Sequence, residues 1–188
     1  MCIRDSFHAD RGQIADVTRR IAESEALLAS STTEITTGGD TGSSTCAVVS
    51  DGDEIVLEKN APVISYGAEA DYICTTARRT PDSRPSDQVL VVCPSGDTEL
   101  TQTSEWNTLG FRGTCSPGFV LKTKTSARHV VPVPYSSISA HTMLPASHIL
   151  WASAWLGLAD AAIAKTRGQV RAAARKSVGI TTCLLYTS

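Results

Sequence analysis

The hydrophobic pattern near the start of the chain has a helical period. Charged residues separate the apolar residues Ile14, Val17, Ile21 and Leu28, which fall on one face of a helix. We therefore predict an amphipathic helix over residues 13–29. Serine, threonine and glycine dominate from residue 30 to about residue 44, a composition that predicts a loop.

The pattern then changes to short runs of β-branched and apolar residues. These runs lie at 46–49, 54–57, 63–65, 72–76, 88–92, 119–121 and 130–133. Turn-forming Asp, Gly, Pro and Ser residues separate several of them. Strands at this spacing predict an antiparallel β-sandwich or barrel.

A second helical pattern follows Pro145. Trp151, Trp155, Leu158 and Ala162 fall on one helical face, and arginine and lysine residues gather towards the C-terminal end, where they favour the helix dipole. The predicted order is a helix, a β-domain and a long helix. This order places the chain in the α+β class.

Composition limits the class of protein. The 188 residues are 41% hydrophobic and 19% charged, which is typical of a globular chain rather than a disordered one. A formal net charge of −2 gives no electrostatic footprint for nucleic acid. The sequence contains no run of about 18 apolar residues, so it predicts no membrane span.

The cysteines indicate a reducing compartment. Four of the six lie away from the chain ends, at Cys46, Cys74, Cys93 and Cys115, and they include no CxxC pair. Zinc sites usually contain such close pairs, so no metal site is predicted. Thiols in apolar, strand-like runs behave as small hydrophobic groups. We expect a cytoplasmic protein with reduced cysteines.

Residues 1–6 and 183–188 are related at the level of DNA. The last six residues can be encoded by TGT CTC TTA TAC ACA TCT, and the reverse complement of this DNA encodes Met-Cys-Ile-Arg-Asp, the start of the chain, from its first ATG. The inverted repeat resembles the transposon end used to fragment DNA for libraries. We expect both ends to be translated adapter, and the residues between them to be a fragment of a longer protein.

Three stretches of polar residues and glycine occur in a recognisable order. Residues 28–40 resemble a Thr-Glu-Pro-Gly-x-Gly-Ser-Asp loop, and residues 59–71 resemble a Lys-x-Trp-Ile-Thr-Asn-Gly-x-x-Ala-Asp strand and turn. Residues 109–116 resemble a Gly-x-Arg-x-Ser-x-Thr turn. Together with Val131-Pro132 and Gly157-Leu158-Ala159, these motifs are similar to those of the acyl-CoA dehydrogenase family over nearly all of residues 7–182.

This resemblance implies a truncated acyl-CoA dehydrogenase architecture. Residues 7–29 would end an N-terminal helical domain, and residues 30–135 would form the flavin-binding middle β-domain. Residues 140–182 would hold the first helix of a C-terminal helical domain. The same helix–β–helix order follows from the hydrophobic pattern.

The resemblance also implies an FAD site. In the family, the Thr-Glu loop binds the pyrimidine edge of the flavin, and a later threonine lies near its reactive nitrogen. The residues at the matching positions are Thr32, Thr33, Gly38, Gly39, Ile64 and Ser65. Glycines let the backbone approach a ligand closely, and Ser65 keeps the hydroxyl.

The chain departs from the family pattern at three positions within these motifs. Ile35 replaces the usual proline, and Gly39 replaces a serine whose hydroxyl reaches the pyrophosphate. Val63 replaces a tryptophan that often packs against the flavin ring. The candidates for a substitute hydroxyl are Thr41, Ser43 and Ser44.

His148 stands where several family members have an arginine that faces the acyl thioester. The resemblance therefore implies a substrate-binding role, and a structural histidine beside Trp151 and Trp155 is the alternative. Arg112 is predicted to bind carbonyl groups of its own turn, and Asp71 to serve its turn in the same way.

In the family, a glutamate removes the α-proton of an acyl-CoA thioester while the β-hydrogen leaves as hydride to the flavin. The resemblance implies this reaction in fatty acid metabolism, with electron-transfer flavoprotein as acceptor and a homo-oligomeric parent protein. The family's base lies beyond the position of Thr182, so no catalytic residue is assigned in this chain. The alternatives are an acyl-CoA oxidase, a flavin-dependent monooxygenase of the same fold, and a non-enzymatic β-sandwich binding module.

Overall fold

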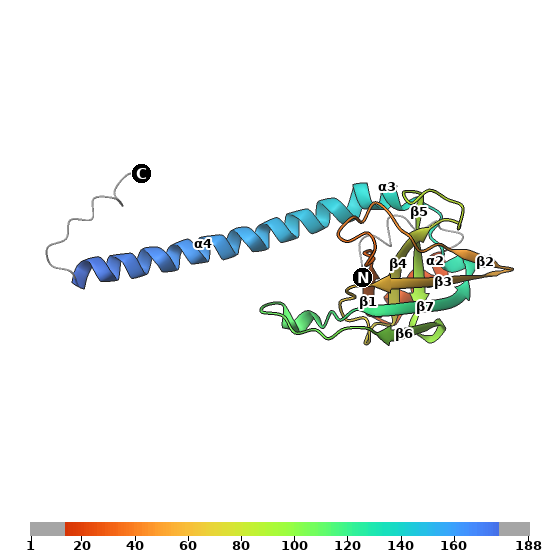
Figure 1. The fold of residues 1–188 in the computed structure, drawn as a ribbon, viewed down its shortest axis with the longest axis horizontal. Coiled ribbons are helices and arrows are strands. Elements are labelled where there is room, and N and C mark those ends of the chain that lie inside the picture. The colour runs from red at the N-terminus through yellow and green to blue at the C-terminus, as the bar shows by residue number, and fades with distance from the viewer. Residues whose placement is uncertain (1–13, 177–188) are drawn as a thin grey trace. The chain divides into compact units, whose positions relative to one another are not determined.

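The structure is a computed structural model that describes residues 14–176 (Figure 1). The chain divides into two compact units between Met143 and Leu144. The ends expected to be adapter, 1–6 and 183–188, lie outside the described residues.

Helix α2 spans Ala15–Glu23 and buries Val17 and Ile21. It ends before the predicted boundary, because Glu25 has a left-handed φ of 51° and the Ala26 N–H binds the Ile21 carbonyl at 3.1 Å. This bond is characteristic of a Schellman cap, whose left-handed position is normally a glycine. A glutamate there gives no sequence signal for the helix end.

Seven strands in the described chain form two sheets. The first sheet has the order β1-β4-β5, with β1 at Leu28–Ser31, β4 at Tyr72–Arg78 and β5 at Gln88–Pro94. The second has the order β2-β3-β7-β6, with β2 at Val49–Asp51, β3 at Glu54–Ala61, β7 at Phe119–Ser126 and β6 at Thr98–Gln102. The helices and the two sheets confirm the predicted α+β class. The sheets do not close into a barrel, so the barrel alternative is not confirmed.

Strand β1 corrects two predictions. Its residues were expected to be the end of a helix and the start of a loop, yet Leu28–Ser31 pairs with β4 from Tyr72 to Thr75. The pairing is parallel, whereas an antiparallel domain was predicted. Serine has little intrinsic preference for strands, so this element depends on its neighbour in the sheet rather than on local pattern.

The expected strand at 46–49 passes from one sheet to the other. The Arg78 N–H binds the Cys46 carbonyl at 2.9 Å, and the Val48 N–H binds the Arg78 carbonyl at 3.0 Å, which ties this segment to the end of β4. At Val49 the chain enters β2 and pairs with β3. The strand of the second sheet therefore begins later than predicted.

Two predicted strands are not strands in the structure. The segment 63–65 is followed by a turn, in which Tyr66 has a φ of 56° that an extended strand cannot accommodate. The segment 130–133 makes only an isolated bridge, between Val130 and Val91. Pro132 and Pro134 lack the N–H groups that would extend this bridge into a ladder.

Strand β6 was not predicted, because its residues Thr98–Gln102 are polar and mostly exposed at the edge of the second sheet. Short helical turns connect or follow the strands: η1 at Ser95–Asp97, η2 at Arg112–Thr114, η3 at Ala127–His129, α3 at Tyr135–Ile138 and the π-helical turn η4 at Ser139–Met143. The last of these turns, η4, ends the first unit.

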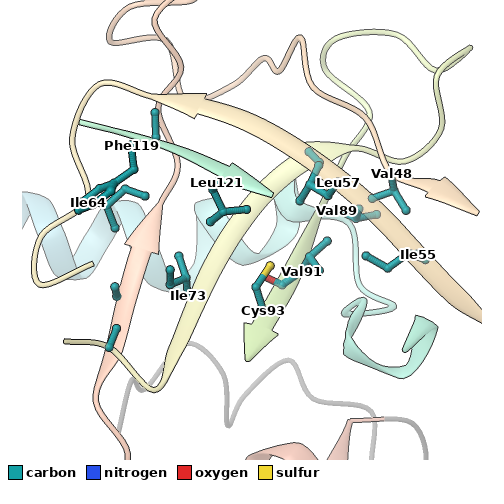
Figure 2. Close-up of a cluster of buried hydrophobic side chains, with 14 residues drawn as sticks. Val48, Ile55, Leu57, Ile64, Ile73, Val89, Val91, Cys93, Phe119 and Leu121 are labelled. Atoms are coloured by element: carbon teal, nitrogen blue, oxygen red, sulfur yellow. The ribbon is translucent and has the colours of Figure 1, made fainter. Parts of the chain in front are cut away.

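Apolar side chains fill the space between the two sheets (Figure 2). On β5, Val89, Val91 and Cys93 face this core, whereas Leu90 and Val92 belong to a second core with α2 and α3. The first sheet is therefore buried on both faces and forms the middle layer. Cys74 and Cys93 are buried as predicted, and burial raises the pKa of the Cys93 thiol to about 12.

The second unit contains helix α4, Leu144–Lys176, which confirms the predicted long helix. Trp151 and Trp155 lie one turn apart on it, with stacked rings whose centroids are 6.0 Å from each other. Within residues 14–176, no helix has the length and apolar character that a membrane crossing needs.

Candidate functional site

A buried ion pair lies beside the loop that follows β1. Glu34 is the first residue of this loop to be buried, and Lys59 occupies an inward position of β3 that the alternating pattern of the strand assigns to the core. The Lys59 Nζ and Glu34 Oε1 atoms are 3.7 Å apart, with side-chain exposures of 0% and 4%. Because both charges are out of water, each needs further polar partners.

The Lys59 ammonium finds those partners on the opposite sheet. It donates to the Ser31 carbonyl at 3.0 Å, the Thr76 carbonyl at 2.8 Å and the Thr76 hydroxyl at 2.9 Å. Burial lowers the pKa of Lys59, and the neighbouring Cys46 and Glu34 groups oppose that effect. One side chain from β3 therefore binds the last residue of β1 and the middle of β4.

The Glu34 carboxylate accepts hydrogen bonds from the segment that leaves the loop. Its donors are the Thr45 N–H at 2.9 Å, the Thr45 hydroxyl, the Cys46 N–H at 3.2 Å and the Cys46 thiol at 3.2 Å. Burial alone would raise the pKa of Glu34, but these bonds and the charge of Lys59 hold it below its ordinary value. Burial raises the pKa of Cys46 to about 12, so its thiol stays protonated and can donate.

The stability that Glu34 gives is expected to depend on pH. Its pKa is lower in the folded chain than in the unfolded one, so the ionised carboxylate stabilises the fold above the unfolded pKa, and this contribution is lost as pH falls through the folded pKa. The difference in unfolding free energy between the unsubstituted chain and the Glu34→Gln variant should become smaller as the pH is lowered from about 7 to about 3. Urea titrations at several pH values measure it. Glu58→Gln, at an exposed pair with Lys122, is the control, and an equal gap at both extremes would contradict the expectation.

The loop after Glu34 turns back on itself. The Gly38 N–H binds the Glu34 carbonyl at 3.0 Å, and Gly38 has a φ of 59°, a conformation that side chains rarely adopt. The Thr37 Oγ1 atom in this loop is buried without a hydrogen-bond partner. A Cβ atom at Gly39 would meet nothing within 4 Å, so the loop presents open space there.

Thr32 and Thr33 lie in a segment whose backbone is hydrogen-bonded at Thr32 and at Ile35. The Thr32 carbonyl accepts a weak bond from the Thr76 hydroxyl at 3.4 Å, and the Ile35 N–H binds the Asn60 carbonyl at 3.2 Å. Both threonine side chains are half-buried. The loop is therefore held at the C-terminal end of β3, a few residues before Ser65.

Ser65 meets the third motif. Its Oγ atom lies 2.8 Å from the Ser116 Oγ atom, and the Ile64 N–H binds the Pro117 carbonyl at 3.1 Å. The Ile64 side chain is fully buried in the core between the sheets, so only its backbone faces this turn. A Cβ atom at Gly67 would lie 2.9 Å from Ile64 Cγ2, which explains the glycine within the second motif, residues 59–71.

The side chains of Arg112 and Asp71 form hydrogen bonds with backbone groups, as was predicted for Arg112. The Arg112 Nε atom donates to the Thr108 carbonyl at 2.6 Å, within its own turn. Asp71 acts over a longer range, because its carboxylate accepts from the Leu27 N–H at 2.8 Å and so joins the start of β1 to β4. Neither side chain belongs to the loop site.

Three large apolar side chains at this end of the sandwich remain exposed. Ile35 follows Glu34, and Val63 and Tyr66 flank Ile64 and Ser65; their exposed fractions are 56%, 41% and 42%. Exposed apolar side chains of this size are typical of a surface that a flat aromatic ligand covers. The residue types present, hydroxyl groups and exposed apolar side chains, are therefore those that a flavin ring requires.

Of the candidates for a substitute hydroxyl, two have partners within the chain. The Ser43 hydroxyl donates to Asp40 Oδ2 at 2.6 Å, and the buried Ser44 hydroxyl lies 2.7 Å from the Gln88 amide. Thr41 is the remaining hydroxyl next to Gly39. His148 lies in α4 of the second unit, so its predicted role beside a substrate stays a prediction.

Sequence reasoning missed Lys59 and gave Glu34 no partner. The signal was present, since Lys59 interrupts the inward row Ile55, Leu57 and Ala61 of an alternating strand. A charged residue at such a position has to be paired. Its partner could not be identified from the pattern, because Glu34 lies in a loop.

No protein-family model and no curated protein sequence matches the chain. Solved structures do match it. An acyl-CoA dehydrogenase from Geobacillus kaustophilus is 18% identical with a TM-score of 0.60, and the match covers 70% of this chain and 35% of that one. A prolyl acyl carrier protein oxidase is 15% identical with a TM-score of 0.58 and coverage of 73% and 36%.

A third match is a glutaryl-CoA dehydrogenase from Mycobacterium smegmatis in complex with FADH2, which is 19% identical with a TM-score of 0.54 and coverage of 69% and 32%. At these identities the likeness shows the fold. The chain has the fold of part of an acyl-CoA dehydrogenase, and it spans about a third of the length of the structures it matches, 32–36% in these three.

Proposed function

We propose that the chain is part of an FAD-dependent acyl-CoA dehydrogenase that introduces a double bond between the α- and β-carbons of an acyl-CoA thioester. The observation that carries the proposal is that the loop of Thr33 and Glu34 is bonded to the end of β3, the strand that leads into Ser65, whose Oγ atom lies 2.8 Å from that of Ser116. These are the three stretches whose residues resemble the family's motifs. The fold likeness supports the same reading.

In this proposal the backbone and hydroxyl groups of Thr32 and Thr33 hold the pyrimidine edge of the flavin, and Ser65 offers a hydroxyl near its reactive nitrogen. Gly38 and Gly39 let the backbone approach the pyrophosphate, with Thr41 as the nearby hydroxyl. The bound flavin supplies the acceptor for the hydride that leaves the β-carbon. The ion pair of Glu34 and Lys59 fixes the backbone from which these donors project.

Glu34 is not the base of the proposed reaction. Its carboxylate is buried, accepts four hydrogen bonds and pairs with Lys59, so it has no free oxygen to receive a substrate proton. The α-proton is instead removed by a glutamate that this chain does not contain.

The proposal also includes the partners of the reaction. His148 binds the substrate, and electrons pass to electron-transfer flavoprotein. The parent protein is a cytoplasmic homo-oligomer.

The experiment compares the chain with its uninterrupted parent protein. The parent should contain bound FAD and reduce an artificial electron acceptor when acyl-CoA is added, whereas the chain as given should show no dehydrogenase activity. Thr33→Val in the parent should weaken FAD binding about tenfold, the effect of losing one hydrogen bond of about 1.4 kcal/mol. Thr101→Val, on the exposed face of β6, is the matched control and should leave FAD affinity unchanged. A parent without flavin, or an active chain, would contradict the proposal.

An oxidase is the second candidate, because one of the structural neighbours is an acyl carrier protein oxidase. In an oxidase, dioxygen takes the electrons from the reduced flavin. Oxygen consumption by the parent without any added acceptor would favour this candidate over a dehydrogenase.

A further inference from the structure

A cleft of about 710 Å³ opens in the first unit away from the loop of Thr33 and Glu34. Helix α2 forms one wall, and the ends of β5 and β7 with the turns η1 and η3 form the others. Its polar lining includes Asp16, Arg20, Asp97, Arg128 and His129. The cleft thus brings together three basic side chains from two separate elements.

Both carboxylates at the cleft already have partners. Asp16 Oδ1 accepts from Arg19 Nη2 at 2.8 Å, and Asp97 Oδ2 accepts from the Thr125 hydroxyl at 2.7 Å. In contrast, neither Arg20 nor Arg128 forms an ion pair with any residue between 14 and 176. Within the described part of the chain, the two guanidinium groups at the cleft therefore take part in no ion pair, although Asp16 and Asp97 line the same cleft.

A chain of hydrogen bonds fixes His129. The Thr125 hydroxyl donates to Asp97, so its oxygen accepts from His129 Nδ1 at 2.5 Å, and Nδ1 carries the proton. The other ring nitrogen, Nε2, is left for a further partner. Burial lowers the pKa of His129, the charge of Arg20 adds to this effect, and the Asp97 carboxylate opposes it.

We propose that this cleft binds the phosphate group of a small soluble phosphomonoester, through the guanidinium groups of Arg20 and Arg128 and the imidazole of His129. Guanidinium groups match the geometry of phosphate oxygens and bind them with paired, charge-assisted hydrogen bonds. His129 joins them as a donor when a bound dianion stabilises its protonated form.

The size of the cleft indicates that the ligand is more than the anion. Its volume of about 710 Å³ is within the usual range for small-molecule sites and far exceeds what one phosphate fills. Val17, Tyr72 and Pro94 also line it, and they offer an apolar and aromatic surface for the organic part of the ligand. A phosphomonoester with a compact organic group fits both features.

The test is a titration of the chain with inorganic phosphate, followed through the ring-proton NMR signals of His129. Saturable binding with a Kd of about 1 mM is expected, and Arg20→Gln and Arg128→Gln should each weaken it about tenfold. Arg84→Gln, at an exposed loop position outside the cleft, is the matched control and should bind like the parental chain.

Acetate at the same concentrations should shift the signals far less, since a carboxylate offers fewer oxygens to the three donors. Equal binding of acetate, no saturation with phosphate, or equal weakening by Arg84→Gln would each overturn the proposal. Because no flavin or acyl-CoA enters this experiment, its result is independent of the proposed enzyme activity. Circular dichroism of each variant separates loss of the site from loss of the fold.

Discussion

Replacing Lys59 with methionine is expected to lower the free energy of unfolding by about 3–5 kcal/mol. The substitution leaves the Glu34 carboxylate buried without its cation, and it removes the donor that serves the carbonyls of Ser31 and Thr76. Methionine fills a similar volume, so the loss comes from unpaired polar groups rather than from a cavity. Urea unfolding of the parental and variant chains measures the difference.

A double substitution separates the two causes. In the double variant Glu34→Gln/Lys59→Met, the buried negative charge is gone. The free energy of unfolding of this variant should therefore be higher than that of Lys59→Met alone. Lys122→Met is the control on the neighbouring strand β7, because its pair with Glu58 is exposed, and exposed pairs contribute about 0–1 kcal/mol. If Lys59→Met and Lys122→Met had the same effect, the buried pair would not stabilise the fold.

Leu121→Ala is expected to destabilise the chain by about 2–5 kcal/mol. Leu121 is 0% exposed and lies on β7 between Lys59 of β3 and Leu100 of β6, in the core between the sheets (Figure 2). Alanine would leave a cavity that the rigid sheets on both sides cannot fill. Thermal and urea unfolding both report the loss.

The same substitution at Leu109 provides the control. Leu109 is 102% exposed in the loop before η2, so Leu109→Ala removes no buried surface and should change the unfolding free energy by less than about 0.5 kcal/mol. Comparable losses at the two positions would mean that the core between the sheets does not carry the stability of this unit.

The strands that could be predicted are those whose side chains alternate or are apolar throughout. β3 alternates between exposed and buried positions along its whole length, and β5 is an apolar run because both of its faces are covered. β1 and β6 lack such patterns, since Ser30 and Ser31 gain their strand conformation from β4 and Thr98–Gln102 lies at an exposed edge. Local pattern carries no information about either contact.

Part of the candidate site could be predicted from the family resemblance rather than from the hydrophobic pattern. The resemblance placed Thr33 and Ser65 in one site although nothing in their spacing does so. The bond between Ser65 and Ser116 joins residues far apart in the chain, and hydrophobic periodicity cannot predict such a pairing. The role of Lys59 could have been suspected from its inward position, but the identity of its partner required the fold.

The bonds of Lys59 also limit how the two sheets can move past each other. Apolar packing resists separation of the sheets, yet it is non-directional and only weakly opposes a sliding motion. A buried ammonium from β3 that binds Ser31 of β1 and Thr76 of β4 is directional, so a lateral shift of either sheet would break its hydrogen bonds. The sandwich is thereby fixed against shear at one point, and that point lies directly before the loop of Thr33 and Glu34.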